Sequence, residues 1–299
     1  MILRDHPRPW QLFFVIRGSV VPRIAPNILF TAVWAIGILI LDRFVMPMPR
    51  LSIPAMGVFG LALSLFLGFR NNAAYDRWWE GRKIWGGMVS DVRSFAQELE
   101  IFGADEGDRS FVLGHILAFH HLHRRQLRGD NVEADVARWV GDEAPKLLAA
   151  DGPDAALRAV STRLAVMRSE GRIDGHGARQ LSTRLSRFAG AQAGNERLST
   201  TPLPFVYSLL VRRTTYLYCL LLPFGLLDCA GWFEPLIAAI VAYVFFGLSE
   251  VTHELERPFA DEPNALPLFA LCRVMERSVC ASLGWDVPDP VAPKNGVLS

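Results

Sequence analysis

The chain has 299 residues, of which 51% are apolar and 20% are charged, and its net charge is +1. Soluble domains carry about 25% charged residues, so this composition favours the membrane class. The balanced charge gives no reason to expect a nucleic-acid partner. The four cysteines are scattered and form no C-x-x-C pair, so they indicate neither a disulfide framework nor a zinc site.

The apolar residues gather in four clusters of 16–19 residues each, at 28–46, 53–69, 214–232 and 233–248. At 1.5 Å per residue, each cluster is near the lower limit for crossing a hydrocarbon core about 30 Å thick. Two buried helical hairpins in a soluble protein are the alternative. Short links at 47–52 and 228–232, and arginines that flank both pairs on the same side, argue against that alternative. The sequence therefore predicts four transmembrane helices.

Basic residues gather before the first cluster and after the second: Arg4, Arg8, Arg17, Arg23, Arg70, Arg77, Arg82 and Lys83. The two short links contribute only Arg50. Because lysine and arginine accumulate on the cytoplasmic side of membrane proteins, we expect both termini and the middle region in the cytoplasm. The protein is then a multi-pass protein with the lipid bilayer as a partner.

The middle region has apolar residues at three- and four-residue spacing in four stretches: 109–128, 132–150, 154–170 and 178–198. This spacing predicts helices, and alternating strand patterns are absent from it. The expected parts are an N-terminal cytoplasmic segment (1–27), transmembrane helices 1 and 2 (28–69), a cytosolic helical domain (70–204), transmembrane helices 3 and 4 (205–249), a C-terminal cytosolic segment (250–286) and a disordered tail (287–299).

The second cluster has two distinct rows of residues at four-residue spacing. One row is bulky and includes Leu61, Leu65 and Phe69; the neighbouring row is small: Gly60, Ser64 and Gly68. Small residues let helices approach closely in lipid, so we expect the small row to pack against another helix. The bulky row then faces either lipid or a central axis. On an axis, repeated copies would form a hydrophobic constriction about 12 Å long that controls ion passage by dewetting.

Four stretches of this chain resemble the bacterial branch of the bestrophin family: IRGSVVPRI (16–24), FLGFRNNAAYDRWWEGRKIWG (66–86), TPLPFVYSLLVRRTTYLYCLLLPFGLLD (201–228) and GLSEVTHELERPFADEPNALPLFALCRVMER (247–277). The middle, about 103–190, is similar only in its helical character. The resemblance implies an all-α ion channel of the bacterial inner membrane. It further implies a homopentamer around one axial pore, with four transmembrane helices and a helical cytosolic domain in each subunit.

The resemblance also implies roles for particular residues. Leu61, Leu65 and Phe69 fall at the positions of the family's pore neck, and a lower cytosolic aperture is expected near His176, with Ile173 as the alternative. A protonatable ring at His176 would make this aperture sensitive to acid. The permeant ions expected from the family are chloride and other anions, although some bacterial members pass monovalent cations.

One departure from the family concerns calcium. Calcium-activated animal members carry a dense acidic run after the equivalent of Pro258 and Phe259, because Ca²⁺ takes several oxygen ligands. Here Pro263 and Asn264 stand where carboxylates would be expected. We therefore expect opening that does not depend on Ca²⁺.

Other candidate sites are weaker. His115, His120, His121 and His123 lie close together in the sequence but lack a matching set of carboxylates or cysteines, so we interpret them as a polar helix face and expect no metal and no cofactor. No nucleophile motif or phosphate-binding loop is found, which argues against an enzyme. The alternative to a channel is a non-conducting membrane scaffold or binding protein that acts through its cytosolic helical domain.

Overall fold

The computed structural model describes residues 1–2, 18–150, 152–294 and 296–298. Regular structure in this part of the chain is helical, apart from isolated bridges of Ile2 and Lys294 with Val297. The prediction of an all-α chain is therefore confirmed. The chain divides into two compact units, which we call the membrane unit (Asp5–Trp78 and Pro202–Arg257) and the helical unit (Met1–Arg4, Trp79–Thr201 and Pro258–Ser299).

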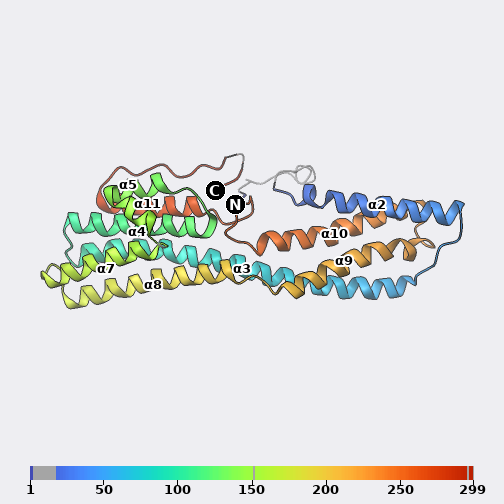
Figure 1. Ribbon diagram of the computed structural model, residues 1–299, viewed down its shortest axis with the longest axis horizontal. Coiled ribbons are helices and arrows are strands. Elements are labelled where there is room, and N and C mark those ends of the chain that lie inside the picture. The colour runs from blue at the N-terminus through green and yellow to red at the C-terminus, as the bar shows by residue number, and fades with distance from the viewer. Residues whose placement is uncertain (3–17, 151, 295, 299) are drawn as a thin grey trace. The chain divides into compact units, whose positions relative to one another are not determined.

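The described part of the membrane unit is built from α2 (Val21–Phe44), the first part of α3 (Ile53–Ile101), α9 (Phe205–Leu226), the short 3-10 helix η2 (Gly231–Phe233) and α10 (Glu234–Leu255). Helix α2 packs along α10, and α9 contacts both (Figure 1). The core includes one buried side chain from each long helix: Ala35, Leu63, Tyr218 and Phe245. These contacts arrange the apolar stretches as one bundle.

The apolar clusters coincide with these helices but not with their ends. Helix α2 begins at Val21, seven residues before the first cluster, because Pro22 suits the first turn of a helix, where backbone N–H groups have no partner. Helix α9 begins at Phe205 and α10 continues to Leu255. These helices therefore extend beyond the apolar clusters predicted from the sequence. Residues 3–17, which include part of the expected N-terminal cytoplasmic segment, lie outside the described residues.

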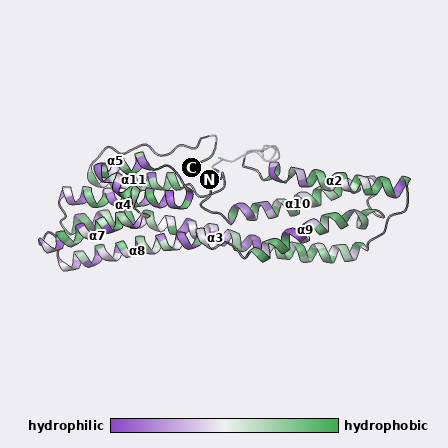
Figure 2. Ribbon diagram, viewed as in Figure 1, coloured by the Kyte–Doolittle hydropathy of each residue, from purple (hydrophilic) through white to green (hydrophobic). Residues whose placement is uncertain are grey.

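Hydropathy distinguishes the helices of the membrane unit. Among the described helices, α2, α3 and the stretch Gly231–Leu255 are long and apolar enough to cross a membrane. They are coloured as hydrophobic along much of their membrane-unit length in Figure 2. Helix α9, the expected third span, is not in this group, because Arg212 and Arg213 lie inside it and lower its mean hydropathy. Several helical spans are therefore present, and a fourth through α9 stays a prediction.

The helical unit contains the rest of α3 and seven further helices among its described residues: α4 (Glu106–Arg128), α5 (Glu133–Val140), η1 (Gly141–Glu143), α6 (Ala144–Ala149), α7 (Asp154–Ser169), α8 (Gly175–Thr200) and α11 (Leu268–Leu283). Local signals fix several ends. Asp105 and Asp174 accept hydrogen bonds from backbone N–H groups in the first turns of α4 and α8. Gly129 ends α4 with φ of 80°, a conformation that glycine adopts without steric cost. The helical character expected of the middle region is confirmed, although the stretch 132–150 is divided into α5, η1 and α6.

Helix α4 is the central helix of this unit, and its histidines are core residues. His115 is 2% exposed, and His120, His121 and His123 are completely buried. The rings of Phe119 and His123 stack with their centroids 6.0 Å apart. The prediction of a polar helix face was therefore wrong. These rings contribute apolar area to the core and use their nitrogens for hydrogen bonds, as His120 does by donating from Nδ1 to the Ile116 carbonyl at 2.6 Å.

The buried histidines predict acid sensitivity of the helical unit. Burial lowers the pKa of His120 to about 3 and that of His123 to about 4, whereas the unfolded chain titrates near its ordinary 6.5. Between pH 6.5 and 4 the unfolded state therefore binds more protons, so stability falls as the pH falls. We expect each ring to cost on the order of 2 kcal/mol between pH 7 and pH 5.

Denaturant unfolding followed at pH 7 and pH 5 measures this loss. His123→Phe, which keeps an aromatic ring at this position, should reduce the difference between the two pH values. An identical difference in the wild type and in this variant would contradict the assignment.

Residues near the two ends of the chain are paired. The Met1 ammonium group donates to the Leu298 carbonyl at 2.6 Å, and the Leu298 N–H donates to the Met1 carbonyl at 2.8 Å. Arg277 also donates to the Pro288 carbonyl at 2.9 Å. Pro288 and Leu298 thus each accept a hydrogen bond, and disorder of the segment 287–299 stays a prediction.

Candidate functional site

The bulky row of α3 is exposed in the single chain. Leu61 is 70% exposed, Leu65 56% and Phe69 57%, whereas Leu63 and Leu67 on the same helix are 2% and 1% exposed. One face of α3 thus packs into the bundle, and the row of leucines and phenylalanine is left uncovered. An exposed apolar row on a helix of this length requires an apolar environment, either lipid or other copies of the same helix.

The small row of α3 has one close contact within the chain. A Cβ atom added to Gly60 would lie 2.7 Å from Tyr218 Oη, so α3 and α9 approach closely there because the residue is glycine. Gly68 has no atom within 4 Å of the corresponding position, and Ser64 Oγ donates to the Leu61 carbonyl at 2.8 Å. Among the described residues of one chain, Gly60 is therefore the member of the small row that packs closely against another helix.

A buried ion pair follows the bulky row directly. Arg70, which is 5% exposed, lies with Nη2 3.3 Å from Glu256 Oε2, just after the end of α10. The other oxygen of Glu256 accepts from the Leu203 N–H at 3.1 Å, and its carbonyl accepts from Arg77 Nε at 3.3 Å. Glu256 thus connects α3 to the segment that precedes α9, and it neutralises the cation nearest to Phe69.

The two other glutamates near the end of α10 pair with α2. Arg23 Nη1 lies 2.7 Å from Glu254 Oε1 and 3.3 Å from Glu250 Oε1. Glu256 therefore pairs with α3, whereas Glu250 and Glu254 face Arg23 because α10 packs along α2.

A second charged cluster joins the two short links at the other end of the bundle. Arg50 Nε lies 2.9 Å from Asp228 Oδ1, and Arg50 Nη2 donates to Asp42 Oδ2 at 3.1 Å. The Met48 N–H also donates to Asp42, at 2.9 Å. Sequence reasoning missed this cluster, although an aspartate inside an apolar run and a lone arginine in a link are signals that could have found it.

The two candidates for the cytosolic aperture differ in exposure. His176, in the first turn of α8, is exposed, and no hydrogen bond joins its ring to the described residues. Ile173, just before α8, is 3% exposed and belongs to the core of the helical unit. Only His176 therefore presents its side chain at the surface of the chain.

One group of described residues has the spacing of a metal site. His121, Asp135 and Glu276 offer ligand atoms that lie within 4.8 Å of one another. An arginine already occupies this position: Arg124 Nη1 lies 3.2 Å from His121 Nδ1 and Arg124 Nη2 2.8 Å from Asp135 Oδ2. His121 Nε2 lies 2.8 Å from Glu276 Oε1. A cation would have to displace this guanidinium group, so the donor set fits a buried charge network better than a metal.

This chain is similar to a family of known proteins over nearly its whole length. The family described as Bacterial/Fungal Bestrophin protein matches residues 1–281. A voltage-dependent anion channel-forming protein of Mesorhizobium japonicum is 44% identical over 295 residues, which cover 98% of this chain and 95% of the relative. A relative of the same description from Escherichia coli is 33% identical over 280 residues and 92% of each chain.

The fold is also that of a solved structure. The crystal structure of a bacterial bestrophin homologue from Klebsiella pneumoniae superimposes with a TM-score of 0.81 at 29% identity, covering 90% of this chain and all of that one. The relatives are described as channel-forming proteins rather than as enzymes. Since the family match and the relatives extend over nearly the whole sequence, the chain belongs to the bacterial and fungal bestrophin family.

Proposed function

We propose that the chain forms an anion channel of the bacterial inner membrane, with Leu61, Leu65 and Phe69 as the hydrophobic neck of its pore. The observation that carries this proposal is the exposure of all three side chains on a helix whose opposite face is buried. We infer that the permeant ions are anions because relatives of this chain are described as voltage-dependent anion channel-forming proteins.

The mechanism follows from the apolar character of the neck. From Leu61 to Phe69 the helix rises about 12 Å, so a ring of such rows would be a constriction two turns long. An apolar constriction resists ions of both signs because ions lose hydration there, and it conducts when it fills with water. Arg70 offers no free positive charge below the neck because Glu256 pairs with it. Selection for anions must therefore come from other charges along the path.

The assembly we propose is a homopentamer with four transmembrane helices per subunit. One α3 cannot enclose a path, so several copies must stand around a common axis. Helix α9 acts as the fourth span: although Arg212 and Arg213 lower its hydropathy, Val211, Tyr218 and Leu222 pack into the core with α2, α3 and α10. The excess of arginines before α2 and after the neck supports cytoplasmic termini and cytosolic segments at 70–204 and 250–286.

Within this assembly, His176 is the residue that we propose for the cytosolic aperture, since Ile173 is buried. Ca²⁺-independent opening is part of the same proposal. It rests on the sequence, in which Pro263 and Asn264 stand where carboxylate ligands would be expected.

The proposal is tested by current recordings of the purified protein in lipid bilayers under a potassium chloride gradient. We expect the reversal potential to shift toward the equilibrium potential of chloride. A shift toward that of potassium would make the channel cation-selective, and the absence of current above protein-free bilayers would favour the non-conducting scaffold.

A native cysteine tests the proposed topology. Cys229, in the link between α9 and α10, is exposed, whereas Cys219, Cys272 and Cys280 are buried. Burial also raises the pKa of Cys272 to about 12, which suppresses its reactive thiolate. We expect a membrane-impermeant maleimide to label spheroplasts at Cys229 alone, and Cys229→Ser to abolish the labelling. Labelling that requires permeabilised cells would contradict cytoplasmic termini.

A further inference from the structure

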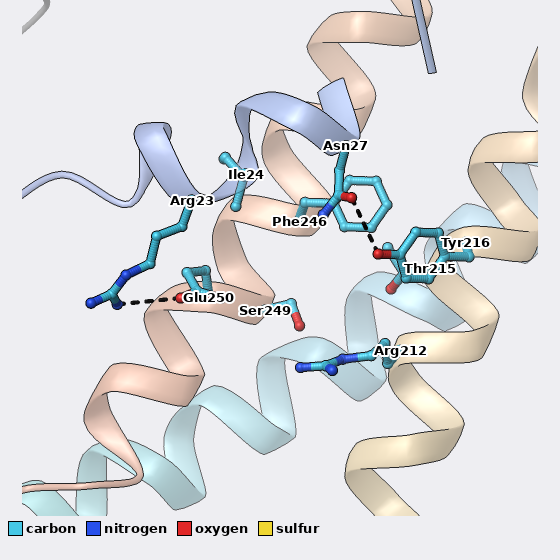
Figure 3. A pocket seen from close by; sticks show the side chains of 9 residues that line it. All are labelled: Arg23, Ile24, Asn27, Arg212, Thr215, Tyr216, Phe246, Ser249 and Glu250. Carbon is cyan, nitrogen blue, oxygen red and sulfur yellow. Dashed lines mark hydrogen bonds and ion pairs between the residues drawn. The ribbon is translucent and has the colours of Figure 1, made fainter. Parts of the chain in front are cut away.

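A cavity of about 170 Å³ lies between α2, α9 and α10 inside the membrane unit. Each helix contributes polar side chains to its wall, as Figure 3 shows: Arg23 and Asn27 from α2, Arg212 and Tyr216 from α9, and Ser249 and Glu250 from α10. Arg23 stands near the start of α2 and Glu250 near the end of α10, so the cavity lies where the bundle passes from apolar to polar residues.

One cation of the cavity wall, Arg212, has no partner among the residues that the structure describes. Arg212 is exposed, and it forms neither a hydrogen bond nor an ion pair with the described residues. In Figure 3 its guanidinium group extends from α9 toward α10, below Ser249. The other arginine of the wall, Arg23, is held by Glu250 and Glu254. Arg212 is thus available to a ligand of negative charge.

Neutral donors lie beside this cation. Tyr216 Oη donates to Asn27 Oδ1 at 3.2 Å, which leaves the amide N–H₂ of Asn27 as a donor. The Ser249 hydroxyl forms no hydrogen bond with the described residues. A guanidinium, an amide and a hydroxyl together suit an anion with several oxygens, because each oxygen can accept from a different donor.

We propose that this cavity binds the phosphodiester group of a membrane phospholipid. Basic pockets between helices at the cytoplasmic face of a membrane are sites for lipid head groups. Leu217 follows the wall residue Tyr216 and Leu248 precedes Ser249 in the sequence, and their exposures of 50% and 37% offer apolar surface to acyl chains. The carboxylate of Glu250 limits the negative charge that the cavity accepts, so a singly charged phosphodiester fits better than a phosphate dianion. The inference requires α2, α9 and α10 to lie in a bilayer, but it does not require ion conduction.

Native mass spectrometry of the purified full-length protein, with phosphatidylglycerol and phosphatidylethanolamine added to the detergent, tests the proposal. We expect saturable binding of one phospholipid per subunit, and we expect Arg212→Gln to weaken it about tenfold, because the lost hydrogen bonds are to a charged group. Arg213→Gln is the matched control. This neighbour on α9 is also an exposed arginine but does not line the cavity, so the affinity should change less than about twofold.

A second variant tests the site even if the Arg212→Gln protein fails to fold. Ser249→Ala changes a different helix and should weaken binding by a smaller factor, with the melting temperature unchanged. Equal affinities for Arg212→Gln and Arg213→Gln would overturn the site. Displacement of the lipid by equimolar glycerophosphoglycerol, a soluble phosphodiester of the same charge, would overturn the membrane lipid as the source of the phosphate, whereas resistance to this competitor supports it. None of these readouts depends on ion current, so they are independent of the test of the channel.

Discussion

Replacing Leu65 or Phe69 by alanine is expected to raise the single-channel conductance about tenfold, if each change lowers the barrier to ion passage by about 1.4 kcal/mol. Both side chains are more than half exposed on the unpacked face of α3, so shortening them widens the proposed neck without opening a void in the bundle. A wider constriction fills with water more readily, and ions then keep more of their hydration in it. The double variant should conduct more than either single variant.

Val33→Ala is the control for this prediction. Val33 is an apolar residue of α2 that is 58% exposed, so its replacement removes apolar surface outside the proposed neck. Its conductance should stay at the wild-type value. Unchanged conductance in both neck variants would count against the neck, and an equal increase for Val33→Ala would attribute the effect to a general loosening of the protein.

Replacing Glu256 by alanine is expected to lower the free energy of unfolding by about 3 kcal/mol. Arg70 is 5% exposed and Glu256 is its ion-pair partner among the described residues, so the change leaves a positive charge buried without a counter-charge. The Leu203 N–H also loses its acceptor. Because a buried charge is far more costly unpaired than paired, this loss exceeds that of a surface ion pair. Denaturant unfolding of the purified protein in detergent measures it.

Glu80→Ala provides the comparison. Glu80 pairs with Arg197, but the two side chains are 41% and 63% exposed, so we expect a loss below about 1 kcal/mol. Adding Arg70→Gln to Glu256→Ala removes the stranded charge and should recover part of the stability. Equal losses for Glu80→Ala and Glu256→Ala, or no recovery in the double variant, would show that Glu256 does not act by pairing with the buried arginine.

Sequence periodicity predicted the helices well because the relevant signals are local. Residues 55–100 contain no proline, and α3 runs unbroken from Ile53 to Ile101. Helix ends were predicted less well. The apolar pattern marked residue 28 as the start of the first span, whereas Pro22 permits α2 to begin at Val21.

The candidate site was predictable where it depends on spacing along one helix, as for Leu61, Leu65 and Phe69. Contacts between segments that are distant in the sequence could not be predicted. Arg50 pairs with the nearby Asp42 and with Asp228, which is 178 residues further along the sequence, and no local pattern specifies that distant partner. The prediction for the histidines of α4 was wrong because it considered only the local sequence. Their local composition is polar, but packing around α4 buries them in the core, where Ile116 and Glu276 satisfy ring nitrogens.

The central claim is that several copies of α3 surround one axis with Leu61, Leu65 and Phe69 turned inward. An experimental structure of the purified protein in lipid nanodiscs tests it most directly. We predict five subunits, with the Leu65 side chains of all copies facing one another across a common axis. A single subunit, or an assembly in which Leu65 and Phe69 contact lipid acyl chains, would contradict the account.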